Sequence, residues 1–206
     1  MRPTVRNTPP EDAVAQRRLT LEEWADLPED DEGELVDGIL VEEEMGGLAH
    51  ESVVAWLIQA LRAWLVGRGG RVAASELKIA VAATRGRKPD VVAWFPGHGP
   101  LPRRGVIRRP PDLLVEVLSS RPKDHRRDRV EKAAEYAAFG VRWYWLVDPD
   151  ACTVEIFERG ADGRYVQALA AVEGRIDTVP GCEGLVLDLD ALWAELDGLV
   201  AERDEV

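Results

Sequence analysis

The sequence predicts a single α/β domain in which a mixed β-sheet is flanked by helices. Two observations favour the α/β class: short apolar runs bounded by Pro, Gly or Ser alternate with segments of helical periodicity, and no repeat or low-complexity linker divides the chain. With 206 residues, of which 46% are hydrophobic, the chain is long enough for one substantial core. We expect residues 1–17 to form a flexible tail, residues 18–200 the domain and residues 201–206 a polar tail.

The first part of the predicted domain contains a short helix, a hairpin and one long helix. Thr20 and Glu23 form a capping-box pattern that starts the short helix, which ends near Pro28. The run 34–41 predicts a β-hairpin with Asp-Gly at its turn. Apolar residues at helical spacing over 50–66 predict the longest amphipathic helix.

Sheet-forming runs dominate the rest of the chain. Their apolar and aromatic residues predict strands around 72–82, 89–95, 112–118, 143–147 and 153–158. A helix is expected over 128–139, ending at Gly140, and one more strand pair precedes a closing helix over 189–200.

Two of these predicted strands carry a carboxylate. Asp90 opens one strand directly after a proline, and Glu116 lies in the middle of the next apolar run. A buried carboxylate must find a cation, hydrogen bonds or a proton. Because the spacing allows the strands to be neighbours, both acids could reach one divalent ion. Lys132 shares a helix face with Asp128 and could extend its amine towards Glu116; the alternative is an ordinary surface ion pair with Asp128.

The charge of the chain is unevenly distributed. The formal net charge is −12, which by itself argues against a nucleic-acid partner. Residues 85–132, however, contain 13 Lys or Arg and 6 Asp or Glu, a balance of +7, against −19 for the remainder. This asymmetry favours a polyanion-binding face on an acidic protein, although solvated Arg-rich loops would leave the same pattern.

The composition also bears on the compartment. Cys152 and Cys182 fit no metal-site spacing, which is typical of a reduced intracellular protein. The first residues do not resemble a signal peptide, and no apolar run approaches the roughly 20 residues that span a bilayer. We therefore expect a cytoplasmic protein that has no membrane partner.

Ordered motifs run along the chain from about residue 19 to residue 196, namely Glu34-Leu35-Val36-Asp37-Gly38, Pro89-Asp90-Val91-Val92, residues 115–119, the triplet Asp128, Lys132 and Tyr136, and residues 140–149. In these motifs the chain resembles the Uma family of restriction endonucleases, which implies a restriction-endonuclease-like mixed β-sheet flanked by helices. The family looks like a branch of the PD-(D/E)XK nuclease superfamily, whose core is a mixed sheet with a metal at one end.

The resemblance implies an endodeoxyribonuclease that hydrolyses DNA with Mg²⁺ or Mn²⁺. Leu118 stands where the superfamily has a lysine, so the catalytic lysine would be Lys132 on the following helix, acting with Asp90 and Glu116. The implied metal ligands are the carboxylates of Glu34, Asp90 and Glu116 and the backbone carbonyl of Val117.

Other interpretations stay open at this point. The missing lysine at position 118 and the acidic net charge also suit an inactive nuclease-fold module that binds DNA or a protein partner. Glu116 could instead be a structural acid paired with Arg142 or Lys132. A homodimer would make a double-strand cut natural. His50 is interpreted as a surface or structural histidine, and the aromatic residues 143–145 as core packing.

Overall fold

The computed structural model describes residues 17–28, 33–42, 46–74, 76–119 and 126–199. At its centre is a six-stranded sheet in the order β10-β9-β8-β7-β6-β3. Strands β7 and β8 run parallel and the other neighbouring pairs run antiparallel, so the predicted mixed sheet is confirmed. Its strands are β3 (Arg71–Ala74), β6 (Val91–Trp94), β7 (Leu113–Val117), β8 (Trp143–Asp148), β9 (Thr153–Arg159) and β10 (Tyr165–Ala171).

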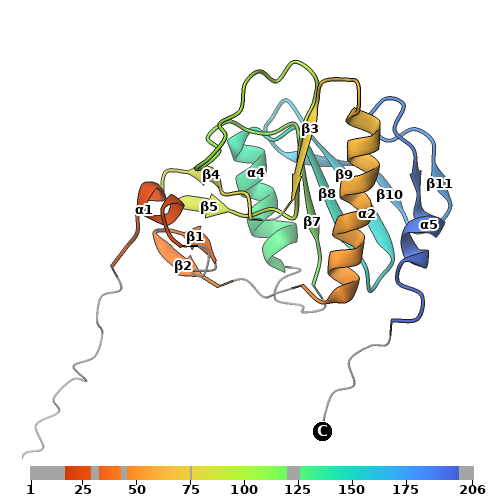
Figure 1. Cartoon of the computed structure of the whole chain (residues 1–206), viewed down its shortest axis with the longest axis horizontal. Coiled ribbons are helices and arrows are strands. Elements are labelled where there is room, and N and C mark those ends of the chain that lie inside the picture. The colour runs from red at the N-terminus through yellow and green to blue at the C-terminus, as the bar shows by residue number, and fades with distance from the viewer. Residues whose placement is uncertain (1–16, 29–32, 43–45, 75, 120–125, 200–206) are drawn as a thin grey trace, which may run out of the picture.

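Helices cover both faces of this sheet, as can be followed in Figure 1. Side chains alternate between the faces of a strand, and β7 shows the division. Leu113 and Val115 belong to the apolar cluster of α2 (Leu48–Leu65), whereas Leu114 belongs to the cluster of α4 (Ala133–Phe139). The central strands are therefore buried on both sides, which explains their nearly continuous apolar sequence.

A smaller four-stranded sheet lies beside the N-terminal helix α1 (Leu21–Ala25). Its order is β2-β1-β5-β4, with β1 (Glu34–Val36), β2 (Ile39–Val41), β4 (Ile79–Ala82) and β5 (Arg85–Arg87). Both predicted N-terminal features are present: the capping box at Thr20, and a hairpin whose turn residues Asp37 and Gly38 have φ of 52° and 82°. Through β1, this small sheet places Glu34 beneath α4.

The predicted strand over 72–82 is two strands in different sheets. β3 joins the central sheet and β4 joins the small one. Between them the chain passes through Glu76, whose φ of 76° is left-handed. The sequence over 72–82 was interpreted as one strand despite the polar residues Glu76 and Lys78 within it, but this turn places its second half in another sheet.

The helix expected over 128–139 is present, with Gly140 at its C-terminal cap at φ 105°. Its first part, η1 (Arg127–Lys132), is a π-helix, and α4 continues from it. A π-helical turn is wider than an α-helical one and is frequently found at functional sites. It changes the angular spacing of the side chains that face the sheet.

The C-terminal part adds β11 (Arg175–Ile176), β12 (Leu187–Asp188) and α5 (Leu189–Ala194). The expected closing helix is therefore shorter than 189–200.

Both cysteines are free thiols. In the portion of the chain that the structure describes, no helix is both long and apolar enough to cross a membrane. Most of the two predicted tails lies outside the described residues.

Candidate active site

The carboxylate of Glu116 is the centre of a buried polar cluster between β7 and the helix η1–α4. Glu116 is the fourth of the five residues of β7, and its side chain lies on the face that α4 covers. The Tyr136 hydroxyl donates a hydrogen bond to Oε1 at 2.5 Å, and the Lys132 ammonium donates one to Oε2 at 3.2 Å. Both partners come from one helical segment, so the fold of that segment determines the surroundings of this acid.

Lys132 joins three acids rather than one. Its Nζ lies 3.3 Å from Glu34 Oε1, 3.2 Å from Glu116 Oε2 and 3.4 Å from Asp128 Oδ1. The residue is 2% exposed, so the surface ion pair that the sequence left open is wrong. Asp128 and Lys132 do share a face, as predicted, and that face is turned into the protein.

Glu34, the first residue of β1, is held from two further sides. Arg87 Nη1 donates to its Oε2 at 2.5 Å, and the backbone N–H of Lys88 donates to Oε1 at 3.1 Å. Burial alone would raise the pKa of Glu34, but the charges of Lys132 and Arg87 outweigh it and lower the pKa to about 2. Glu34 is therefore ionised at neutral pH.

Asp90 lies at the start of β6, beside Glu116. In the antiparallel register Val91 pairs with Val115, so the next position along places Asp90 opposite Glu116, and opposite residues point to the same face. Its Oδ2 accepts the backbone N–H of Val117 at 2.7 Å. The same oxygen lies 3.3 Å from Nε2 of His50, which is in the first turn of α2. The predicted adjacency of the two strands is confirmed.

The cluster holds more negative charge than its ammonium compensates. Burial raises the pKa of Glu116 well above its usual range, and the charges of Asp90, Asp128 and Glu34 raise it further against the opposing effect of Lys132. Burial likewise raises the pKa of Asp128. Asp128 Oδ1 is buried and has no hydrogen-bond partner among the residues that the structure describes. An electrostatic imbalance of this sign favours uptake of a cation or a proton.

The donors match Mg²⁺ or Mn²⁺ in kind, because both ions prefer hard carboxylate and carbonyl oxygens. The arrangement of these oxygens, however, leaves less room for an ion. Within the described ranges, no three His, Cys, Asp or Glu side chains are grouped as a ready metal site. Glu34 and Glu116 close on the Lys132 ammonium instead, while Asp90 turns towards the N–H of Val117.

Sequence reasoning missed two residues of this region. His50 was interpreted as a surface or structural residue, yet its side chain is largely buried and contacts Asp90. Burial lowers its pKa, but the hydrogen bond and charge of Asp90 outweigh this and the net pKa is raised. Its position at the start of the helix that carries the apolar stripe was the available signal.

The second residue is Arg87, whose basic segment was expected to form a polyanion-binding face, but which lies inside the protein. It is 1% exposed and bridges Glu34 to Glu135, donating to Glu135 Oε2 at 2.7 Å. Its local sequence, Arg-Gly-Arg-Lys, is typical of a solvated loop, so only the fold reveals its burial.

The remaining candidates have structural roles. Trp143, Tyr144 and Trp145 are buried, as predicted for core packing. Arg142 pairs with Glu158 at the surface and not with Glu116. His98 contacts Asp112 in a loop, at 3.0 Å.

Comparison with known proteins identifies the family. The model of Uma2, described as "Putative restriction endonuclease", matches residues 20–190. The chain belongs to the Uma2 family. The expected family resemblance is thereby confirmed, and the Uma2 match covers every residue of the cluster described above. No curated protein matches the chain.

A solved structure agrees with the Uma2 assignment at the level of the fold. It is a crystal structure from Anabaena variabilis ATCC 29413, described as a "putative nuclease belonging to DUF820". It superposes with a TM-score of 0.69 at 20% sequence identity, over 86% of this chain and 99% of that one. The predicted nuclease-like α/β fold is confirmed in a single domain.

Proposed function

We propose that this Uma2 protein is an endonuclease that hydrolyses DNA phosphodiester bonds with Mg²⁺ or Mn²⁺. The observation that carries the proposal is the convergence of two acids from neighbouring strands, Asp90 and Glu116, beside a buried ammonium group. Phosphodiester hydrolysis requires charge neutralisation, a positioned water and help for the leaving oxygen. A carboxylate pair with an adjacent lysine can serve these needs.

Asp90, Glu116 and the Val117 carbonyl would hold the ion. A bound divalent ion supplies Lewis-acid stabilisation of the developing charge and lowers the pKa of a bound water. Glu34 would take part indirectly: its carboxylate is already held by Arg87, so it keeps the Lys132 amine near Glu116. The excess of negative charge around Glu116 supports a cation at this position.

Lys132 would orient the attacking water or stabilise the transition-state charge. Leu118 stands at the position of the superfamily lysine but has no ammonium group. It is 2% exposed and packs in the apolar cluster below α4. Lys132 approaches the same acid from the helix instead. The chemical group is thus retained near Glu116 although its place in the sequence differs.

DNA would be held by exposed arginines. Arg103 and Arg104 lie on the exposed loop between β6 and β7, and Arg126 is exposed at the start of the helical segment. Arg87 is excluded from this role by its burial. Phosphate contacts from such residues give affinity that falls steeply with salt.

The test is cleavage of supercoiled plasmid in Mg²⁺ or Mn²⁺. The wild-type protein is expected to produce nicked or linear DNA, and Asp90→Asn and Glu116→Gln to abolish this. Glu131→Gln is the matched control, because Glu131 is an exposed acid on the same helical segment and should retain activity. Circular dichroism of each variant verifies folding.

The alternative function is an inactive module that binds DNA without cleaving it. It is favoured by the contacts of Glu34 and Glu116 with the Lys132 ammonium. It predicts DNA binding with no metal-dependent product. Full cleavage by folded Glu116→Gln protein would refute the proposed mechanism. Calorimetric titration with Mn²⁺ separates a structural acid cluster, which binds no ion, from a metal site.

A further inference from the structure

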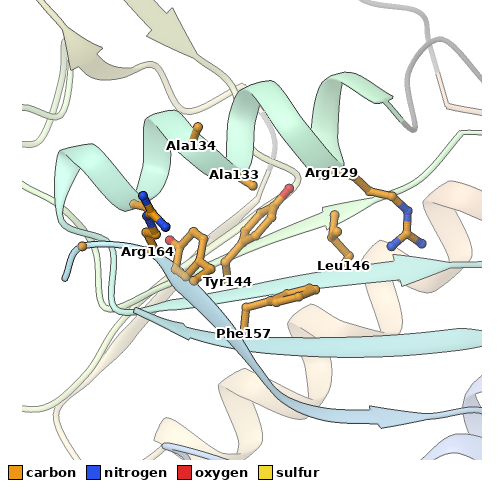
Figure 2. Close-up of a pocket in the computed structure, with 10 residues that line it drawn as sticks. Arg129, Ala133, Ala134, Tyr144, Leu146, Phe157 and Arg164 are labelled. Atoms are coloured by element: carbon orange, nitrogen blue, oxygen red, sulfur yellow. The ribbon is translucent and has the colours of Figure 1, made fainter. Parts of the chain in front are cut away.

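A cavity of about 420 Å³ lies between α4 and the strands β8, β9 and β10, apart from the acid cluster. Figure 2 shows the helix on one side of it, Tyr144, Leu146 and Phe157 on the other, and Arg129 and Arg164 towards opposite ends. Its volume is in the range of small-molecule sites, which is about 300–1,000 Å³. None of the carboxylates proposed as metal ligands lines it.

One wall of the cavity is aromatic. The rings of Tyr144 and Tyr165 are stacked, with centroids 5.5 Å apart and an interplanar angle of 24°, and Phe157 lies beside Tyr144 with centroids 6.4 Å apart. Both phenol groups are already occupied, since Tyr144 donates to the Asp128 carbonyl and Tyr165 to the Val141 carbonyl. Tyr144 is fully buried behind this wall, whereas Phe157 and Tyr165 are partly exposed. A ligand would therefore meet the rings of Phe157 and Tyr165, which favour stacking over hydrogen bonding.

The opposite wall is lined by the small side chains of Ala133, Ala134 and Ala137 on α4. Because each alanine side chain is a single methyl group, this face of the helix projects little into the cavity. Together with the aromatic wall they leave a narrow, largely apolar slot, and such a shape suits a flat ring system.

The charges on the cavity are positive. Its lining includes two arginines and no acid. Arg129 is ion-paired with Glu155, but Arg164 is exposed and its guanidinium has no ion-pair partner among the described residues. On a protein of net charge −12, a cavity with this lining selects for an anion.

We propose that this slot binds a nucleotide, with the base between the aromatic and alanine walls and the phosphate on Arg164. Guanidinium groups bind phosphate through charge-assisted, often bidentate hydrogen bonds. The proposal is independent of the cleavage reaction and of its metal. The same chemistry is offered by a free nucleoside monophosphate and by an unstacked nucleotide of a DNA strand.

Binding is measured calorimetrically on the full chain in EDTA, which removes any contribution from divalent metal. The probes are the four nucleoside monophosphates, adenosine, inorganic phosphate, and a short single-stranded oligonucleotide with and without one abasic position. Monophosphates are expected to bind at least roughly tenfold more tightly than adenosine or phosphate, because only they engage both the rings and Arg164. Binding of the oligonucleotide alone, weakened by the abasic position, would identify a nucleotide within a strand as the ligand.

Two variants with matched controls test the location. Ala133→Leu fills the slot, because Ala133 lies on the side of the helix that faces the rings (Figure 2). Arg164→Ala removes the free cation, and each substitution is expected to weaken binding roughly tenfold. Ala138→Leu is the control on the same helix, since Ala138 is exposed and does not line the cavity; Arg175→Ala is the control for charge. If no probe binds at millimolar concentration, or if Ala133→Leu and Arg164→Ala bind like the controls, the proposal is overturned.

Discussion

Replacing Lys132 with methionine tests the electrostatic account of the acid cluster most directly. Methionine retains the length and helix propensity of lysine but removes the ammonium. Three contacts of 3.2–3.4 Å are lost. At an effective dielectric constant of about 20, each contributes about 5 kcal/mol of Coulomb attraction before desolvation is subtracted.

The net effect is smaller, because burying the ammonium already offsets most of that attraction. Removing one partner of a buried ion pair typically costs about 3–5 kcal/mol, and we expect Lys132→Met to lower the free energy of unfolding by this amount at pH 8. The loss should shrink as the pH falls, because protonated Glu116 and Asp128 no longer need a cation. Lys88→Met is the control: among the described residues its ammonium pairs with Glu76, whose side chain is 75% exposed, so about 1 kcal/mol or less is expected.

Urea denaturation at pH 5 and pH 8, with and without Mg²⁺, measures these effects. Because the substitution releases Glu116 and Asp128 from the ammonium, Mg²⁺ should stabilise Lys132→Met more than the wild type. A variant as stable as the Lys88→Met control at pH 8 would refute the reasoning. Stabilisation by Mg²⁺ that is equal in both proteins would refute the release of a cation site.

Four further perturbations address the cluster, the proposed DNA surface and the fold. Glu116 has a raised pKa when folded, so its favourable contribution exists below the unfolded value of 4.5 and is lost as the pH rises; Glu116→Gln should therefore gain stability relative to wild type between pH 5 and pH 8 in urea titrations. Glu34, with a pKa of about 2, behaves oppositely: Glu34→Gln should cost about 3–5 kcal/mol above pH 4.5, a deficit that closes as the pH falls towards 2. Replacing both Arg103 and Arg104 with alanine should reduce the salt slope of DNA binding in EDTA, measured by gel shift, by about 2, and an unchanged slope would remove these residues from the DNA surface. Gly140→Ala should lower stability by about 1–2 kcal/mol through its left-handed backbone, since the added Cβ meets only Pro110 at 3.6 Å; calorimetric Tm equal to wild type would contradict this.

Local patterns in the sequence were sufficient for much of the fold. The capping box at Thr20, the Asp-Gly turn, the apolar stripe of α2 and the glycine cap at Gly140 each depend on residues a few positions apart. Such local patterns predict structure reliably because the short-range contacts that they favour are also present in the folded protein. The spacing of two compact apolar runs also allowed the strands of Asp90 and Glu116 to be neighbours, and the structure confirms that they are.

Contacts between distant segments could not be obtained in this way. The burial of Arg87, its bridge from Glu34 to Glu135 and the contact of His50 with Asp90 join residues that are 40 or more positions apart. The division of the 72–82 run between two sheets likewise depends on which strand edges are available.

The sequence by itself determined the α/β class and the family, because apolar periodicity and ordered motifs are local properties of the chain, and it singled out Asp90 and Glu116 as candidate acids. Only the tertiary structure decided that Lys132 is buried among Glu34, Glu116 and Asp128. The physical reason is that the protonation and pairing of a carboxylate depend on distance and desolvation in three dimensions, and these exist only once β1, β7 and η1 are packed together.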